Sequence, residues 1–215
     1  MKTFKTAIVA ATMMTSASAM AVEVSGNVAV GSDYFFRGYD QSLGVALSGG
    51  FDLDLGNGLY AGTWGSSVDD YTSTGGLEID HYIGYGGSFS DSVSFDIGYM
   101  LYTYPNDTQF NFEEVYGSVS FSDVTLGFAT STDWYGADKS YDYFYADYGM
   151  DLNDSYSLGF HYGTTFADSD WDDYSISLST EAAGLGFDLS WISTSEAGED
   201  YYADNEFVLT ISKSM

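Results

Sequence analysis

From Val22 onward, hydrophobic and polar residues alternate in about twelve segments of the chain. In the clearest segment, from Val93 to Tyr102, apolar residues occupy every second position, with Ser94 and Asp96 among the residues between them. A period of two is typical of β-strands with one apolar and one polar face. Many segments reach ten residues or more, which suits a membrane-spanning strand of about 9–11 residues better than the usual strand of about 5–6.

The connections between the segments alternate in length. Short turns lie near Asn57, Asp91, Asp123, Asn153 and Gly184, and longer polar loops follow at residues 37–41, 69–76, 105–110, 133–140, 168–172 and 194–203. Short periplasmic turns and long extracellular loops are typical of bacterial outer-membrane barrels. Residues 22–215 are therefore predicted to form an all-β fold, a closed antiparallel transmembrane β-barrel of about 12 strands, with both chain ends on the periplasmic side.

A soluble β-sandwich is the alternative fold, because its strands also alternate. Aromatic residues beside the long loops argue against it, since rings gather at membrane–water interfaces. We expect such an interfacial girdle from Tyr34, Phe35, Phe36, Tyr39, Tyr102, Tyr104, Trp134, Tyr135, Tyr141, Phe166, Trp171, Trp191, Tyr201 and Tyr202. The segment from Leu59 to Val68 carries small residues on both faces, so its pattern does not decide whether Tyr60 and Trp64 face lipid or lumen.

The first 21 residues have the features of a secretory signal peptide. A basic start at residues 1–5 precedes a short apolar run at residues 6–14, and small residues follow. The motif A-x-A predicts cleavage after Ala19 or Ala21. The apolar run is well short of the ~20 residues that a membrane-spanning helix needs, so we predict removal of residues 1–21 rather than an anchor.

The chain is strongly acidic, with 32 Asp and Glu residues against 5 Lys and Arg. After the predicted cleavage the remaining basic residues are Arg37, Lys139 and Lys213. Phosphate recognition needs the opposite charge, so nucleic acid is excluded as a partner. Abundant aromatic and branched residues argue against disorder, and with no cysteine no disulfide framework supports the fold.

Several acids occupy the polar frame of the strands, which lines the lumen if the apolar frame meets lipid. The predicted lumen-lining acids are Glu23, Asp52, Glu78, Asp80, Asp96, Glu114, Asp147, Asp173, Asp188 and Glu206. Facing carboxylates reinforce a negative potential and attract cations. Arg37, the single arginine, is placed with this set; we expect it to pair with a luminal acid rather than to recognise a substrate, with stacking on a ring as a further option.

Two stretches suggest other chemistry. Residues 168–173 resemble a calcium loop but lack the central Gly and terminal Glu of an EF-hand, which favours a solvated loop and leaves only weak divalent binding open. The histidines are His81, which lies in the lipid-facing frame, and His161. Neither has the spacing to a serine and an acid that would predict a catalytic triad. No catalytic residue, metal site or cofactor is predicted.

Five stretches together resemble the TorF-type porin family, and the resemblance covers nearly the whole predicted mature chain. They are residues 32–38 (SDYFFRG), 58–66 (GLYAGTWGS), 78–80 (EID), 98–105 (GYMLYTYP) and 113–116 (EEVY). The family is largely uncharacterised, so the resemblance implies an outer-membrane, porin-like protein without naming a substrate. The chain departs from the usual outer-membrane pattern at its end, where Met215 stands in place of an aromatic residue.

The sequence thus predicts a porin-like channel in the bacterial outer membrane for passive diffusion of small hydrophilic solutes, with a preference for cations. Its expected partners are outer-membrane lipid, small solutes or cations, and the outer-membrane assembly machinery. Two alternatives remain: a plugged barrel with a structural, adhesive or sensing role, and an outer-membrane lipid-modifying enzyme.

Overall fold

The computed structural model describes residues 22–69, 76–106, 108–196, 198–199 and 201–215; the predicted signal peptide lies outside these ranges, as does Asp70 in the second long loop. Twelve antiparallel strands close into one barrel, in which β1 pairs with both β4 and β14. The wall strands are β1 (Glu23–Gly31), β4 (Ala46–Gly56), β5 (Leu59–Ser67), β6 (Leu77–Ser90), β7 (Val93–Thr103), β8 (Phe112–Phe121), β9 (Val124–Ser131), β10 (Tyr141–Asp151), β11 (Tyr156–Phe166), β12 (Trp171–Ala182), β13 (Leu185–Thr194) and β14 (Glu206–Ser214). The predicted fold class is confirmed.

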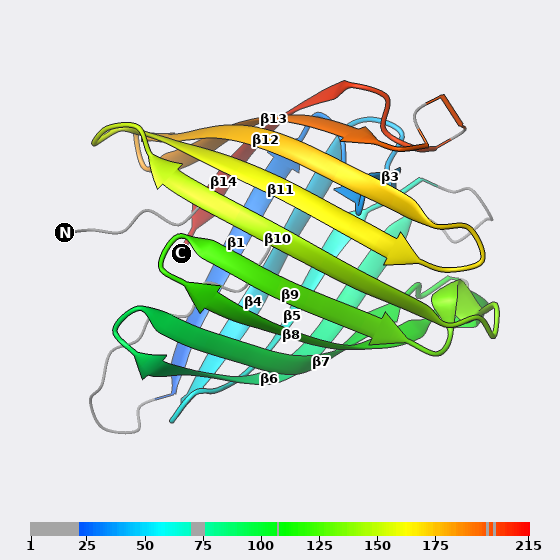
Figure 1. Cartoon of the computed structure of the whole chain (residues 1–215), viewed down its shortest axis with the longest axis horizontal. Coiled ribbons are helices and arrows are strands. Elements are labelled where there is room, and N and C mark those ends of the chain that lie inside the picture. Colours follow the sequence, from blue (N-terminus) through cyan, green and yellow to red (C-terminus); the bar gives the residue numbers. More distant parts are fainter. Residues whose placement is uncertain (1–21, 70–75, 107, 197, 200) are drawn as a thin grey trace.

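The short turns gather at one end of the barrel and the long loops at the other (Figure 1). We call these the turn end and the loop end. All five short turns fall where the sequence predicts them, between β4 and β5, β6 and β7, β8 and β9, β10 and β11, and β12 and β13. The alternating pattern of apolar residues already begins at Leu43, but Leu43 has a left-handed φ of 48° in the first loop, and β4 begins at Ala46.

The outer face of the wall is apolar. Large side chains such as Leu47, Ile83, Leu126 and Ile176 are exposed on the isolated chain. Lipid tolerates a spanning sheet only if every backbone group is paired, which closure of the barrel achieves. Within the described ranges, no helix is long and apolar enough to cross a membrane. A closed barrel with an outward apolar face is the architecture of a bacterial outer-membrane protein.

The first loop folds into the barrel at the loop end. It carries a short hairpin of β2 (Phe35–Phe36) and β3 (Tyr39–Asp40), visible away from the turn end in Figure 1. Arg37 of this hairpin contacts Glu114 of β8 and accepts a hydrogen bond from Trp171 of β12 on its carbonyl oxygen. Because β8 and β12 stand on different parts of the ring, a loop that touches both lies in the lumen.

An aromatic core fills the space around this hairpin. Tyr102, Tyr104, Phe112, Tyr141 and Tyr143 are buried. Also packed against them are Phe36, Phe110 of the 3-10 turn η1 (Thr108–Phe110), and Trp134 and Tyr135 of a second 3-10 turn, η2 (Trp134–Gly136). The expectation that these loop-end aromatics form an outer girdle is therefore wrong for Phe36, Tyr104, Trp134, Tyr135 and Tyr141. Tyr141 points inward because it shares the polar frame of its strand, as Tyr102 does, whereas the other four lie on loop segments that fold into the lumen.

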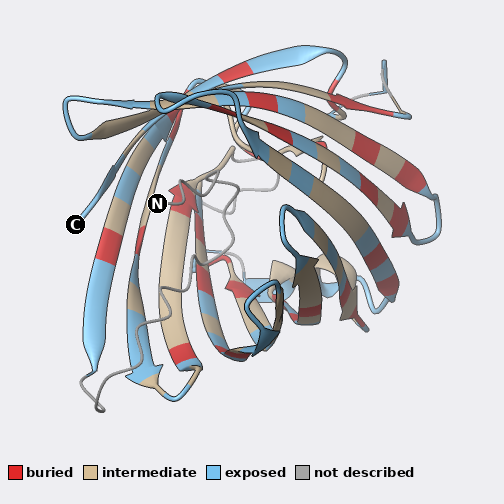
Figure 2. Cartoon of the chain, turned by 60° about the vertical axis from the view of Figure 1, so that its left-hand side comes forward, coloured by how far each residue is buried: buried red, intermediate tan, exposed pale blue. Residues whose placement is uncertain are grey.

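Buried positions recur as bands along the strands (Figure 2), and most of them belong to the loop-end half. There the wall acids Glu78 and Asp173 and the tyrosines Tyr102 and Tyr141 are buried, whereas Glu23 at the turn end is exposed. The lumen is thus packed near the long loops and more open near the short turns.

Candidate functional site

The predicted lumen-lining acids fall into three groups by burial. Glu78, Asp80, Glu114 and Asp173 are buried in the loop-end half. Asp52, Asp96, Asp147 and Asp188 are half-buried along the wall, while Glu23 and Glu206 are exposed at the first residues of β1 and β14. Most of the wall acids accept hydrogen bonds from neighbouring side chains, many of them tyrosine hydroxyls, so they do not stand alone in water.

Tyrosines reach these acids by crossing a glycine on the strand between. Tyr82 of β6 lies beside Gly62 of β5, and its hydroxyl donates to Asp52 of β4. Any side chain at position 62 would overlap the Tyr82 ring. The ring can therefore lie flat across the middle strand only because that residue is glycine.

The same arrangement recurs on neighbouring strands. Tyr60 of β5 crosses Gly84 of β6, and its hydroxyl donates to Asp96 of β7 at 2.9 Å. Tyr116 crosses Gly98 from the opposite side, and its hydroxyl meets that of Tyr60 at 2.6 Å. The structure thus shows which way the segment from Leu59 to Val68 faces, because Tyr60 points into the lumen. Trp64 points into the lumen as well, where its ring centroid lies 5.4 Å from that of Tyr34 in the first loop.

Glu78 is held by two tyrosines from loop segments. Tyr104 donates to its Oε2 at 2.6 Å and Tyr34 donates to its Oε1 at 3.0 Å. Asp80, two residues on, has an Oδ1 atom that is buried without a hydrogen-bond partner. Glu78 and Glu114 both act electrostatically on Asp80, so these three acids form one electrostatic cluster on the inner wall, which we call the buried acid cluster.

Arg37 neutralises part of the buried acid cluster. Its Nη2 lies 2.8 Å from Oε1 of Glu114, and its side chain is 9% exposed. Burial lowers the pKa of Arg37, but the charge of Glu114 and neighbouring tyrosines outweigh that effect, so the pKa stays above its usual value. The predicted pairing of Arg37 with an inner-face acid is confirmed, and its guanidinium also lies 4.1 Å from the ring centroid of Tyr143.

His161 joins two acids that the sequence did not connect. Its Nδ1 lies 2.6 Å from Asp147 and its Nε2 lies 2.8 Å from Asp173. The hydroxyl of Tyr143 is also 2.9 Å from Nε2. A catalytic triad needs one ring nitrogen on a nucleophile, whereas here carboxylates engage both. His161 points inward, whereas its neighbours Phe160 and Tyr162 on β11 point outward. The alternation in the sequence therefore predicts the direction of its side chain, but not its partners.

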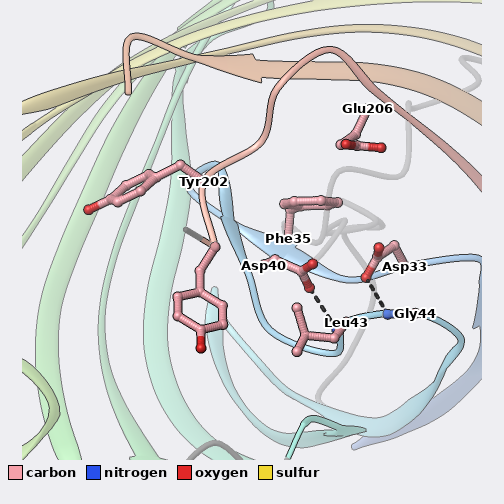
Figure 3. A pocket seen from close by; sticks show the side chains of 8 residues that line it. Asp33, Phe35, Asp40, Leu43, Gly44, Tyr202 and Glu206 are labelled. Carbon is pink, nitrogen blue, oxygen red and sulfur yellow. Dashed lines mark hydrogen bonds between the residues drawn. The ribbon is translucent and has the colours of Figure 1, made fainter. Parts of the chain in front are cut away.

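A pocket of about 290 Å³ lies where the first loop meets the last long loop. Asp33, Asp40 and Glu206 supply carboxylates to it around the ring of Phe35, and Tyr202 also lines it (Figure 3). Asp40 accepts the backbone N–H of Leu43 at 2.8 Å and Asp33 accepts that of Gly44 at 3.2 Å. Burial, together with the nearby charge of Asp33, raises the pKa of Asp40 to about 6 against the opposing effect of these backbone bonds.

The described residues contain no group of three or more His, Cys, Asp or Glu side chains placed to hold a metal ion. In the calcium-like run, Asp168 forms an exposed ion pair with Lys139, and Asp170 accepts the backbone N–H of Ala167 at 3.0 Å. His81 is exposed on the outer face, as its frame predicts.

Solved outer-membrane barrels share this architecture. The KdgM porin superposes with a TM-score of 0.58 at 11% identity, over 88% of this chain and 97% of its own. The NanC porin gives a TM-score of 0.58 at 10% identity, over 89% and 98% of the two chains. KdgM in complex with disordered oligogalacturonate gives 0.56 at 9% identity, over 89% and 96%. At these identities the likeness is one of fold.

The sequence matches no curated protein. Residues 15–215 match the model of a family described as "Bacterial protein of unknown function (Gcw_chp)".

Proposed function

Since the chain belongs to the bacterial Gcw_chp family, to which no function is assigned, we propose from its geometry that it is a porin-like channel for passive diffusion of small hydrophilic solutes, with a preference for cations. The resemblance to TorF-type porins and the fold shared with KdgM and NanC support a channel. The cation preference has separate support, from the charges inside the barrel.

The observation that carries the preference is the charge balance in the packed half of the lumen. Glu78, Asp80, Glu114 and Asp173 are buried there, and the basic side chains described in that half are Arg37 and His161. Buried charges are screened less than those of surface loops, so any ion that passes the hairpin meets a negative wall. An oligosaccharide of uronic acid, such as the oligogalacturonate complexed with KdgM, carries the wrong charge for this wall.

Refolded protein in a planar bilayer under a KCl gradient tests the proposal, with a reversal potential that favours K⁺ as the expected result. Neutralising Glu78, Asp80 and Asp96 should weaken the preference more than neutralising Asp168, Asp170 and Asp172. The second set is the matched control, because it has equal charge but lies in or beside an exposed loop. Anion preference, or equal effects of the two triple variants, would refute the assignment of the lumen acids.

A plugged barrel with a structural, adhesive or sensing role is the second candidate. The inward hairpin and the aromatic core around Phe112 support it, because they occupy the loop end of the lumen. A refolded barrel that shows no conductance, even after the hairpin residues 35–40 are replaced by a short glycine-serine turn, would favour this candidate over the channel.

A further inference from the structure

The guanidinium of Arg37 lies in a cage of three rings and one carboxylate. Its central carbon is 4.1 Å from the ring centroid of Tyr143, 4.6 Å from that of Phe36 and 5.2 Å from that of Tyr141. Oε1 of Glu114 lies 2.8 Å from its Nη2 atom and forms an ion pair with it. A planar cation stacks on aromatic faces and pairs with a carboxylate in the same plane, which a compact ammonium does less well.

Most of this cage is built without Arg37. Glu114 is also held by the Tyr102 hydroxyl, which donates to Oε2 at 2.8 Å. Tyr143 is anchored by His161 at 2.9 Å, and both Tyr141 and Tyr143 are buried wall residues of β10. Phe36 is the one ring that comes from the hairpin itself. Withdrawal of Arg37 would therefore leave a formed, desolvated anionic site in the wall.

Arg37 also fills this site incompletely. Its Nη1 atom and the Oε1 atom of Glu114 are both buried without a hydrogen-bond partner. The backbone at Arg37 is left-handed, with φ of 52° followed by 77° at Gly38, a conformation that is unfavourable for a residue with a side chain. The hairpin thus holds its arginine in the cage against local strain.

We propose that this cage is a recognition site for guanidinium groups, held in this structure by the chain's own Arg37, and that solutes with a free guanidinium compete with Arg37 for it. The inference rests on the proposed channel, since such a solute reaches the cage through the lumen. Arg37 then occupies the cage in place of a cationic solute. When such a solute displaces the Arg37 side chain, the hairpin is released from the wall.

Chemical complementation of Arg37→Ala in the refolded full chain tests the site, with methylguanidinium as the probe and methylammonium as the control of equal charge. We expect methylguanidinium to raise the melting temperature of the variant saturably and to change its tryptophan fluorescence through Trp134 and Trp171. Methylammonium should require at least tenfold higher concentrations for the same shift. The response should vanish in Arg37→Ala/Glu114→Gln. In Lys139→Ala, which loses an exposed ion pair instead, Arg37 still competes for the cage, so the same fluorescence change should require a higher concentration of methylguanidinium and the melting temperature should not rise.

Equal responses to the two cations, or an unchanged response after Glu114→Gln, would overturn the site. If Arg37→Ala does not refold, the same methylguanidinium and methylammonium titrations are made with Arg37→Gln, and the same outcomes decide. Conductance of the unmodified protein is measured in the same preparation. Binding without conductance would refute the channel and keep the cage, whereas conductance without guanidinium-specific binding would refute the cage alone.

Discussion

Arg37 and Glu114 form an ion pair of 2.8 Å inside the barrel, with the arginine on an inward hairpin and the glutamate on the wall strand β8. The two residues are 77 positions apart in the numbering of the chain, so this pair ties the first loop to a distant part of the wall. Removing one partner leaves the other charge buried and uncompensated.

We therefore expect Arg37→Gln and Glu114→Gln each to lower the free energy of unfolding by about 3–5 kcal/mol, the usual cost of breaking a buried pair. The double variant should cost clearly less than the sum of the two. Urea unfolding in detergent, followed by tryptophan fluorescence, measures all four proteins. Additive losses would show that the pair has no coupling energy and that the hairpin is held by its other contacts.

The glycines under the tyrosines give a second prediction. Gly84→Ala should destabilise the barrel by about 1–3 kcal/mol, as overpacking usually does, because a Cβ at this position overlaps the ring of Tyr60. Gly186→Ala is the matched control, since the atom nearest to its Cβ is the hydroxyl of Ser212, which can rotate away. The same urea titration should separate the two variants; equal losses would mean that the ring of Tyr60 moves aside freely.

The strands and the facing of the acids were predictable because both depend on local periodicity. Alternation assigns Glu78, Asp80 and Tyr82 to one face from their spacing alone, and closure of the barrel makes that face the inner one. The inward direction of Tyr141 was available from the same parity. It was missed because aromatic residues near loops were assigned to the membrane interface without regard to their frame.

The contacts between acids and their donors could not be predicted in the same way. The bond from Tyr82 to Asp52 depends on the registers of two successive strand pairs, β4–β5 and β5–β6. The first loop is held inside the barrel by contacts between residues far apart in the sequence. One of them joins Arg37 to Trp171, which are 134 residues apart. Only the placement of a single arginine among rings hinted at it.

The end of the chain gives a third prediction. Met215 exchanges two backbone hydrogen bonds with Gly26, at 2.9 and 3.1 Å, and so completes the seam between β14 and β1. Deleting residues 207–215 should abolish the heat-modifiable folded form seen on gel electrophoresis, because an open edge in lipid leaves backbone groups unpaired. Met215→Phe should fold at least as well, and with higher yield if the assembly machinery reads a terminal aromatic residue. A truncated chain that still folds would contradict the role of β14 in closure.

The last prediction concerns pH and the first loop. Burial and the neighbouring charge of Asp33 raise the pKa of Asp40 to about 6, and the groups that face it in the pocket are Asp33, Glu206, Tyr201 and Tyr202. Because its pKa is higher in the folded loop than in an open one, protonation favours the folded loop. The stabilisation of the folded loop by protonated Asp40 is complete below about pH 4, the ordinary pKa range of an aspartate. It is lost as the pH rises through about 6, the pKa of Asp40 in the folded loop.

The hairpin should therefore be held more firmly at pH 4.5 than at pH 7.5. Hydrogen exchange of the amides of Ser42 and Leu43, which donate to Asp40, measures this after correction for the intrinsic pH dependence of exchange. Asp40→Asn keeps an acceptor oxygen but removes the titration, so its amides should stay protected at both pH values. Asp142→Asn, on an exposed acid of β10, controls for the loss of one negative charge. If protection rises with pH, or if Asp40→Asn leaves the pH dependence intact, Asp40 does not govern the opening of this loop.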